Sequence, residues 1–214
     1  MAGRPAVIAF AGLLLSGCVT GGARYTPPAP RAPTPNWITI QRTIDDVWKT
    51  AIPRLGQRFF VINTIDRSSG LINVSYSGSP EEYVDCGQIT SEVEDVQGKR
   101  SQTFAASASH KIYEDVFNGK LIIWDRTMRL EGRINLIFEA LDNSTTKVTA
   151  ATRYVVTRTT IPQQAGFAPG PPASTTISFT SGQGATFEVG RNLVTCNPTG
   201  TLEASLLRII EGGD

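Results

Sequence analysis

Few residues of this chain have types and spacings that suit catalysis. His110 is the only histidine, and it follows Ala108-Ser109 in a polar stretch that is typical of a solvated surface. Without a second imidazole or a visible nucleophile beside it, Ser-His-Asp catalysis and histidine-based metal sites are not expected. We therefore expect no catalytic residue, no metal site, no cofactor and no enzymatic activity.

Two other groups of residues suggest chemistry only at first sight. Glu81, Glu82 and Asp85 could pair as carboxylates, but three acids in a polar stretch are typical of a solvated loop. The glycines of residues 182–184 lack the lysine and the following helix that a phosphate-binding loop needs, so a hairpin turn is expected there.

Cys18 is the strongest candidate for chemistry, through modification. Arg4 precedes an apolar run over residues 7–15, which has the length of a secretory signal and is too short for a membrane span. The sequence Leu15-Ser16-Gly17-Cys18 resembles the lipobox of bacterial lipoproteins. The resemblance implies that residues 1–17 are a signal peptide and that Cys18 becomes acylated. Several acyl chains on one residue would together anchor the protein stably.

A proline-rich segment follows this cysteine. Residues 18–36 contain five prolines and few large apolar side chains, which predicts a disordered, extended tether between the acylated cysteine and a folded domain. Val19 stands where an aspartate often signals inner-membrane retention, so the lipoprotein resemblance implies an outer-membrane, periplasm-facing location in a Gram-negative bacterium.

Cys86 and Cys196 are the remaining cysteines. Two cysteines in an exported protein usually form a disulfide, although two separate buried thiols are the alternative. Asp85-Cys86-Gly87 then forms one end of the bridge, with a tight turn at Gly87.

Residues 37–214 are expected to form one domain. Residues 37–40, 59–65 and 71–76 have strand patterns, and apolar residues over 44–55 follow a helical period behind a predicted cap at Thr43. Strict alternation over 128–140 and 148–156 predicts two paired strands, with weaker strands at 175–180 and 185–189. A C-terminal helix with a cap at Thr199 or Thr201 completes an α+β fold, in which an antiparallel sheet packs against an N-terminal and a C-terminal helix. Residues 78–120 give little pattern.

Charge limits the classes of partner. Arg4 is the only charged side chain in residues 1–17, so the mature chain has 19 basic and 19 acidic side chains, and no excess of positive charge favours nucleic acid. The solvent-exposed face of the expected strand at 128–140 carries Arg129, Glu131 and Arg133, and charges on such a face can select a protein partner.

Residues 44–49, 59–62 and 66–76 together resemble the helix-grip domain of BamC-type outer-membrane lipoproteins, in which a helix carrying a tryptophan (here Trp48) precedes a hairpin. This chain has one such domain where that family has two, and it adds two cysteines and a strand-rich region at 121–189. The resemblance implies a structural or accessory role in a cell-envelope assembly, with other envelope proteins as partners. The alternative is a binding module that holds a lipid or other apolar ligand between sheet and helix.

Overall fold

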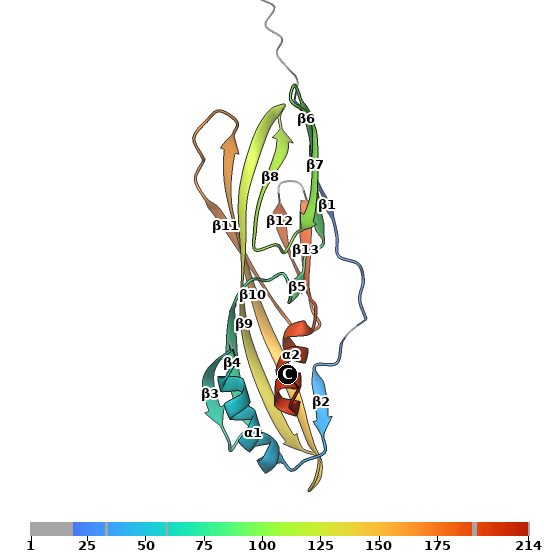
Figure 1. Cartoon of the computed structure of the whole chain (residues 1–214), viewed down its shortest axis with the longest axis vertical. Helices are drawn as coiled ribbons and strands as arrows, with labels where there is room; N and C mark the ends of the chain where they lie inside the picture. The colour runs from blue at the N-terminus through green and yellow to red at the C-terminus, as the bar shows by residue number, and fades with distance from the viewer. Residues whose placement is uncertain (1–18, 33, 59, 190–191, 214) are drawn as a thin grey trace, which may run out of the picture.

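A long β-hairpin runs through the whole molecule (Figure 1). The computed structural model describes residues 19–32, 34–58, 60–189 and 192–213. The hairpin consists of β9 (Lys120–Ala140) and β10 (Thr146–Gln164), which pair antiparallel along their full lengths. At about 3.3 Å per residue, β9 extends roughly 70 Å. Each half of the hairpin has its own neighbours, so we distinguish a helix half (lower in Figure 1) from a turn half (upper in Figure 1).

The helix half is a five-stranded region of the large sheet with two helices on one face. Here β2 (Trp37–Ile40) pairs with β10, while β4 (Leu71–Gly78) pairs with β9 and carries β3 (Val61–Asp66) at its outer edge. Helices α1 (Ile44–Gly56) and α2 (Thr201–Glu211) contact each other and the sheet. The ring of Trp48 on α1 meets Phe138 of β9 edge to face, with centroids 5.1 Å apart.

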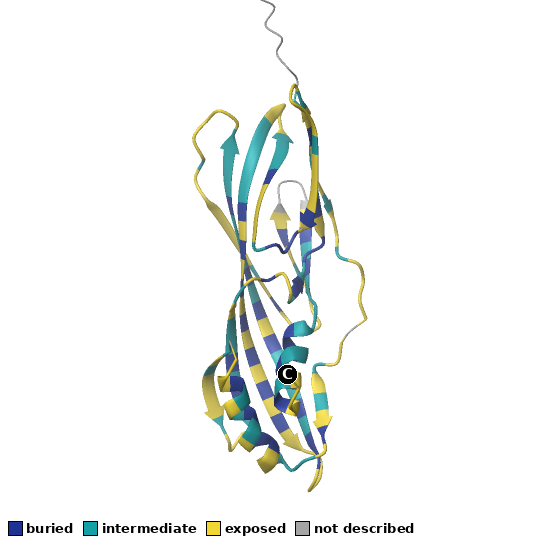
Figure 2. Cartoon of the chain, in the orientation of Figure 1, coloured by how far each residue is buried: buried dark blue, intermediate teal, exposed yellow. Residues whose placement is uncertain are grey.

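The sequence explains these elements locally. Along β9 from Met128 to Phe138 every second residue is buried and the residues between them are exposed, which Figure 2 shows as bands along the strand. Thr43 caps α1 as expected: its hydroxyl oxygen accepts a hydrogen bond from the backbone N–H of Asp46 at 3.2 Å. Pro53 lies inside α1, and the helix continues to Gly56.

The turn half contains strands only. There β8 (His110–Phe117) pairs with β9, and β11 (Ala173–Thr180) pairs with β10. A second sheet consists of β1 (Thr20–Thr26), β6 (Gln88–Asp95) and β7 (Gly98–Ala105), in the order β1-β6-β7. A third consists of β12 (Ala185–Val189), β13 (Asn192–Pro198) and β5 (Val84–Asp85).

The expected α+β class is wrong. Of the described residues, 58% lie in strands and 13% in helices, and the strands form three antiparallel sheets instead of one sheet packed against an N-terminal and a C-terminal helix. The helices cover one face of the helix half only (Figure 1). Most of the additional strands come from residues 78–120, whose weak pattern hides four of them.

The tether also differs from expectation. Residues 20–26 form β1, which pairs in register with β6. Two side-chain contacts add to this backbone pairing. The backbone N–H of Ala23 donates to Asp115 at 2.8 Å, and the hydroxyl of Tyr25 accepts from the backbone N–H of Thr195 at 3.0 Å. The described residues after β1 follow the surface, where Arg31 pairs with Asp85 at 3.3 Å.

Two smaller expectations are corrected. The cap position of α2 is Gly200, with a positive φ of 79° and no side-chain cap bond, instead of Thr199 or Thr201. Residues 185–189 pair with β13 and not with residues 175–180. Neither helix in the described part of the chain combines the length and the apolar character that a membrane crossing needs.

Candidate functional site

The structure tests the prediction for two of the three cysteines. Cys86 and Cys196 form the predicted disulfide, and both are fully buried. The bridge joins the segment between β5 and β6 to β13. Cys18, with the proposed signal peptide, lies outside the described residues.

His110 lies at the exposed start of β8. Its Nε2 is 2.8 Å from Oδ1 of Asp125 on β9, and its side chain is 56% exposed. Within the described ranges, no group of three histidine, cysteine or acidic side chains could hold a metal ion.

The acidic residues near Cys86 are not gathered into one cluster. Glu81 accepts hydrogen bonds from the N–H and the hydroxyl of Ser109, which lower the pKa of its carboxyl. Asp85 instead accepts from the N–H of Gly87 at 2.9 Å. Both carboxylates therefore fasten loops and leave no paired acid–base site.

Arg129, Glu131 and Arg133 are exposed on the outer face of β9, as the alternation predicts. Arg133 lies directly opposite Arg153 of β10, so two like charges face each other across the hairpin. That arrangement is unfavourable unless a counter-charge is supplied.

The groove expected between sheet and helices is filled. The facing side chains of Leu55, Leu130, Ile134 and Leu206 are fully buried. Gly132 has a structural reason to be glycine, since a Cβ there would lie 3.1 Å from Cδ2 of Leu202. The helix half therefore has no room for an apolar ligand at this position.

The turn half contains a cavity instead. It has a volume of about 860 Å³ and lies between the inner face of the β8-β9-β10 sheet and strands β1, β6 and β13. This volume falls within the roughly 300–1,000 Å³ of small-molecule sites. The lining is mainly apolar and aromatic: Ala23, Tyr25, Ile89, Tyr113, Val116, Phe117, Ile122, Trp124, Pro162 and Val194.

Arg158 is the cationic centre of this cavity. On β10 it faces Met128 of β9, on the inward side of the alternating pattern. Burial lowers the pKa of its guanidinium, and the hydroxyl of Tyr113 lies beside it. Within the described ranges no carboxylate forms an ion pair with Arg158, so this half-buried positive charge has the ring of Phe187, 5.8 Å from its guanidinium carbon, and the hydroxyl of Tyr113 as neighbours but no counter-ion.

A second guanidinium adjoins Tyr113. Arg126 is 1% exposed, and burial lowers its pKa to about 10. It donates to the backbone oxygens of Ala105, Ala106 and Ala108, while its Nε has no hydrogen-bond partner within the described structure. Arg126 is not among the residues that line the cavity, because its guanidinium is bonded to the backbone of residues 105–108.

The cavity lining contains one acid. Asp115 accepts hydrogen bonds from the N–H groups of Ala23 and Val116, both at 2.8 Å, and so it fastens β1 to β8. With Arg24 and Arg158 also in the lining, the balance of charge stays positive.

A smaller cavity of about 490 Å³ lies beside residues 28–36, and it borders a buried polar network. Glu203 on α2 is 2% exposed and accepts hydrogen bonds from the hydroxyls of Tyr154, at 2.7 Å, and Ser181, at 2.6 Å. Both carboxylate oxygens are thus satisfied from within the protein, and the network holds α2 against β10.

No protein-family model matches this chain, and neither the curated proteins nor the solved structures contain a match to it.

Sequence reasoning missed Arg126, Arg158 and Tyr113. A signal was present for the two arginines: extending the alternation from Met128 back to Arg126, and from Val156 on to Arg158, places both on the buried face. A charged residue on the buried face of an alternating strand is unusual, and it indicates a candidate functional site.

Proposed function

We propose that this protein is an exported lipoprotein, anchored to the outer membrane by acyl chains on Cys18, that binds an amphipathic anion in the cavity of its turn half. The observation that carries this proposal is Arg158: a half-buried guanidinium without a carboxylate partner, in a cavity of about 860 Å³ lined mainly by apolar side chains. A ligand with an acidic head and a hydrocarbon chain would match both parts. The chain would bury apolar surface, and the acid would neutralise the guanidinium.

Binding of palmitate tests this proposal directly. Trp124 lines the cavity, whereas Trp37 and Trp48 lie in the helix half, so a Trp124→Phe variant identifies the fluorescence change that comes from the site. We expect saturable binding that Arg158→Leu weakens by roughly 10- to 100-fold, because a hydrogen bond to a charged group contributes about 1.5–3 kcal/mol.

Arg153→Leu is the matched control, since Arg153 lies on the same strand with an exposed side chain. Equal affinities of the Arg158→Leu and Arg153→Leu variants, or no saturable binding by the unmodified protein, would refute the site.

The anchor has its own test. Replacing Cys18 with serine should abolish labelling by a clickable palmitate analogue and leave the precursor uncleaved. Persistent labelling of the Cys18→Ser protein would rule out acylation at this residue.

A second candidate is an accessory role in a cell-envelope assembly, as the resemblance to BamC-type lipoproteins implies. The observation in its favour is the exposed outer face of β9, where Arg133 lies directly opposite Arg153 and no ion pair of either arginine is found among the described residues. Reversing the charges of Arg129, Glu131 and Arg133 should reduce recovery of a partner from detergent-solubilised outer membranes, because exposed charges steer and select partners. His110→Ala is the control, and it should leave recovery unchanged. Equal recovery with both variants would refute this role for the face.

A further inference from the structure

The outermost end of the turn half, which we call the turn end, consists of three connections between strands. They are the β6–β7 turn, the β8–β9 turn and the loop between β10 and β11, all at the upper end of the molecule in Figure 1. A large apolar side chain lies exposed in or beside each connection: Val96 in the β6–β7 turn is 83% exposed, Phe117 at the end of β8 60%, and Phe167 in the β10–β11 loop 64%. Exposed apolar residues therefore occur at all three connections of the turn end.

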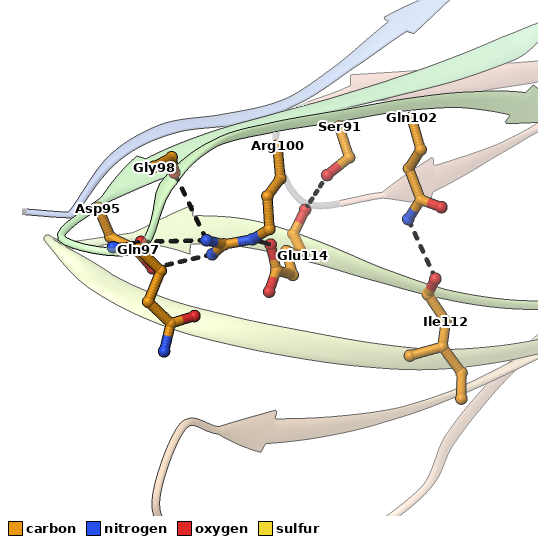
Figure 3. A network of polar contacts seen from close by, with 8 residues as sticks. All are labelled: Ser91, Asp95, Gln97, Gly98, Arg100, Gln102, Ile112 and Glu114. Carbon is orange, nitrogen blue, oxygen red and sulfur yellow. Dashed lines mark hydrogen bonds and ion pairs between the residues drawn. The ribbon is translucent and has the colours of Figure 1, made fainter.

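The first of these turns is held rigidly. Arg100 donates to both carboxylate oxygens of Asp95, at 3.0 and 2.8 Å, and its Nε donates to Glu114 of β8 at 2.8 Å (Figure 3). This arginine therefore ties the β6–β7 turn to the neighbouring sheet. It also pairs with Asp95, the residue directly before Val96.

The start of the described chain lies at the same end. Thr20, the first residue of β1, pairs with Glu94 next to the β6–β7 turn. One residue, Val19, separates Thr20 from Cys18, and two residue steps span at most about 7 Å. An acyl chain on Cys18 would therefore hold a bilayer against this end of the molecule.

We propose that Val96, Phe117 and Phe167 insert into the interface of the lipid bilayer to which the protein is anchored. This inference rests on the acylation of Cys18 in the proposed function, but not on ligand binding. Exposed lysines at positions 99 and 120 lie beside two of the tips, where they suit anionic headgroups, while Glu94 is the exposed acid among them.

The orientation also gives the cavity access to lipid. Phe117 at the end of β8 and Asn118 in the β8–β9 turn belong to the cavity lining. A cavity bounded by this turn would receive an amphipathic ligand from the membrane side without passage through water.

Single thiols introduced into the full-length, acylated protein test this orientation. Cys86 and Cys196 are paired, so an environment-sensitive fluorophore can be attached at position 96, 117 or 167. Leu141, 57% exposed in the turn between β9 and β10 at the opposite end, supplies the matched control. The protein is reconstituted into vesicles of phosphatidylethanolamine and phosphatidylglycerol, with and without nitroxide-labelled lipid.

We expect blue-shifted emission at positions 96, 117 and 167, quenched several-fold more strongly by the nitroxide lipid than the label at position 141. Equal quenching at both ends would overturn the inference. Blue-shifted but unquenched labels would show that protein, such as a second copy of the chain, covers the turn end, and would overturn it as well.

The outcomes separate this inference from the proposed function. Quenching at the three positions without palmitate binding would refute the ligand site and leave the bilayer contact standing. A chain that carries no acyl group and does not float with the vesicles would refute both.

Discussion

Removal of the Tyr154 hydroxyl tests the buried network that holds α2 on the sheet. Tyr154 is fully buried, and its hydroxyl donates to Oε2 of Glu203 at 2.7 Å, while its ring stacks on Phe179 with centroids 5.2 Å apart. Burial, with Glu203 beside it, raises the pKa of Tyr154, so the phenol keeps its proton as a donor. Tyr154→Phe preserves the stacking and removes only the hydrogen bond.

The expected loss follows from the burial of both partners. Oε2 of Glu203 loses the donor described for it in a site where water has little access, and a hydrogen bond to a charged group contributes about 1.5–3 kcal/mol. We expect the free energy of unfolding to fall by about 2–3 kcal/mol and the melting temperature by roughly 4–12 °C, since 1 kcal/mol corresponds to about 2–4 °C in a chain of this size.

Urea unfolding followed by circular dichroism measures the loss, with an unchanged m-value as the condition for comparison. Tyr76→Phe is the control, because the hydroxyl of Tyr76 donates to the backbone oxygen of Ser79 in an exposed setting, at 3.1 Å. If Tyr154→Phe costs no more than Tyr76→Phe, the network does not stabilise the fold as argued. In the double variant Tyr154→Phe/Glu203→Gln, the two losses should not add fully, because both changes affect the Tyr154–Glu203 hydrogen bond, while Glu203→Gln also alters the bond from Ser181.

Three further predictions concern stability. Reduction of the Cys86–Cys196 disulfide, which closes a separation of 110 residues, should lower the free energy of unfolding by about 5 kcal/mol on the chain-entropy argument; a melting temperature unaffected by dithiothreitol would contradict it. Gly70→Ala should lower the free energy of unfolding, measured in urea, by about 2 kcal/mol or more, because Gly70 has a φ of +62° and a Cβ would lie 2.5 Å from a backbone oxygen of β9. Gly56→Ala is the control: a Cβ there meets open space, so this change should be neutral or slightly stabilising. Hydrogen bonds from Ser68 and Ser69 lower the pKa of the Asp66 carboxyl to about 2. The contribution of this carboxylate to stability is therefore present above about pH 4 and is lost as the pH falls towards 2, and Asp66→Asn should flatten that part of the pH dependence of unfolding.

The elements of the helix half could largely be predicted from the sequence because the pattern that defines each one is local, although β2 pairs with β10 and β4 with β9 across long separations. The alternation over residues 128–140 and 148–156 describes one face of β9 and β10, and the two strands are joined by a short turn. The cap at Thr43 and the hairpin across Gly70 are equally local.

The turn half could not be predicted because the apolar alternation of residues 78–120 is weak and because two of its pairings, β1 with β6 and β13 with β5, join distant segments of the chain. Residues 20–26 contain two glycines and suggest a linker, yet they pair with β6 more than sixty residues further along the chain. At Gly21, with a φ of +109°, a Cβ would collide with the backbone of Glu92, so the glycine that suggests flexibility is required by the strand contact.

The larger cavity was hidden for the same reason. Ala23, Tyr113, Arg158 and Val194 come from four strands that the chain order leaves far apart. Only the two arginines on the dry face of the hairpin gave a local sign of it.

The continuous hairpin has a consequence for how the molecule opens. A single ladder of backbone hydrogen bonds between β9 and β10 runs through both halves, so neither half can lose its sheet without exposing the end of the other. Amide hydrogen exchange in the middle of β9, near Met128 and Leu130, should therefore occur only through global unfolding, and the two halves should show one calorimetric transition. Because β9 and β10 are continuous, a displacement imposed on the turn end should move the helix half, with α1 and α2, together with the turn half. No hinge between the two halves would absorb the displacement.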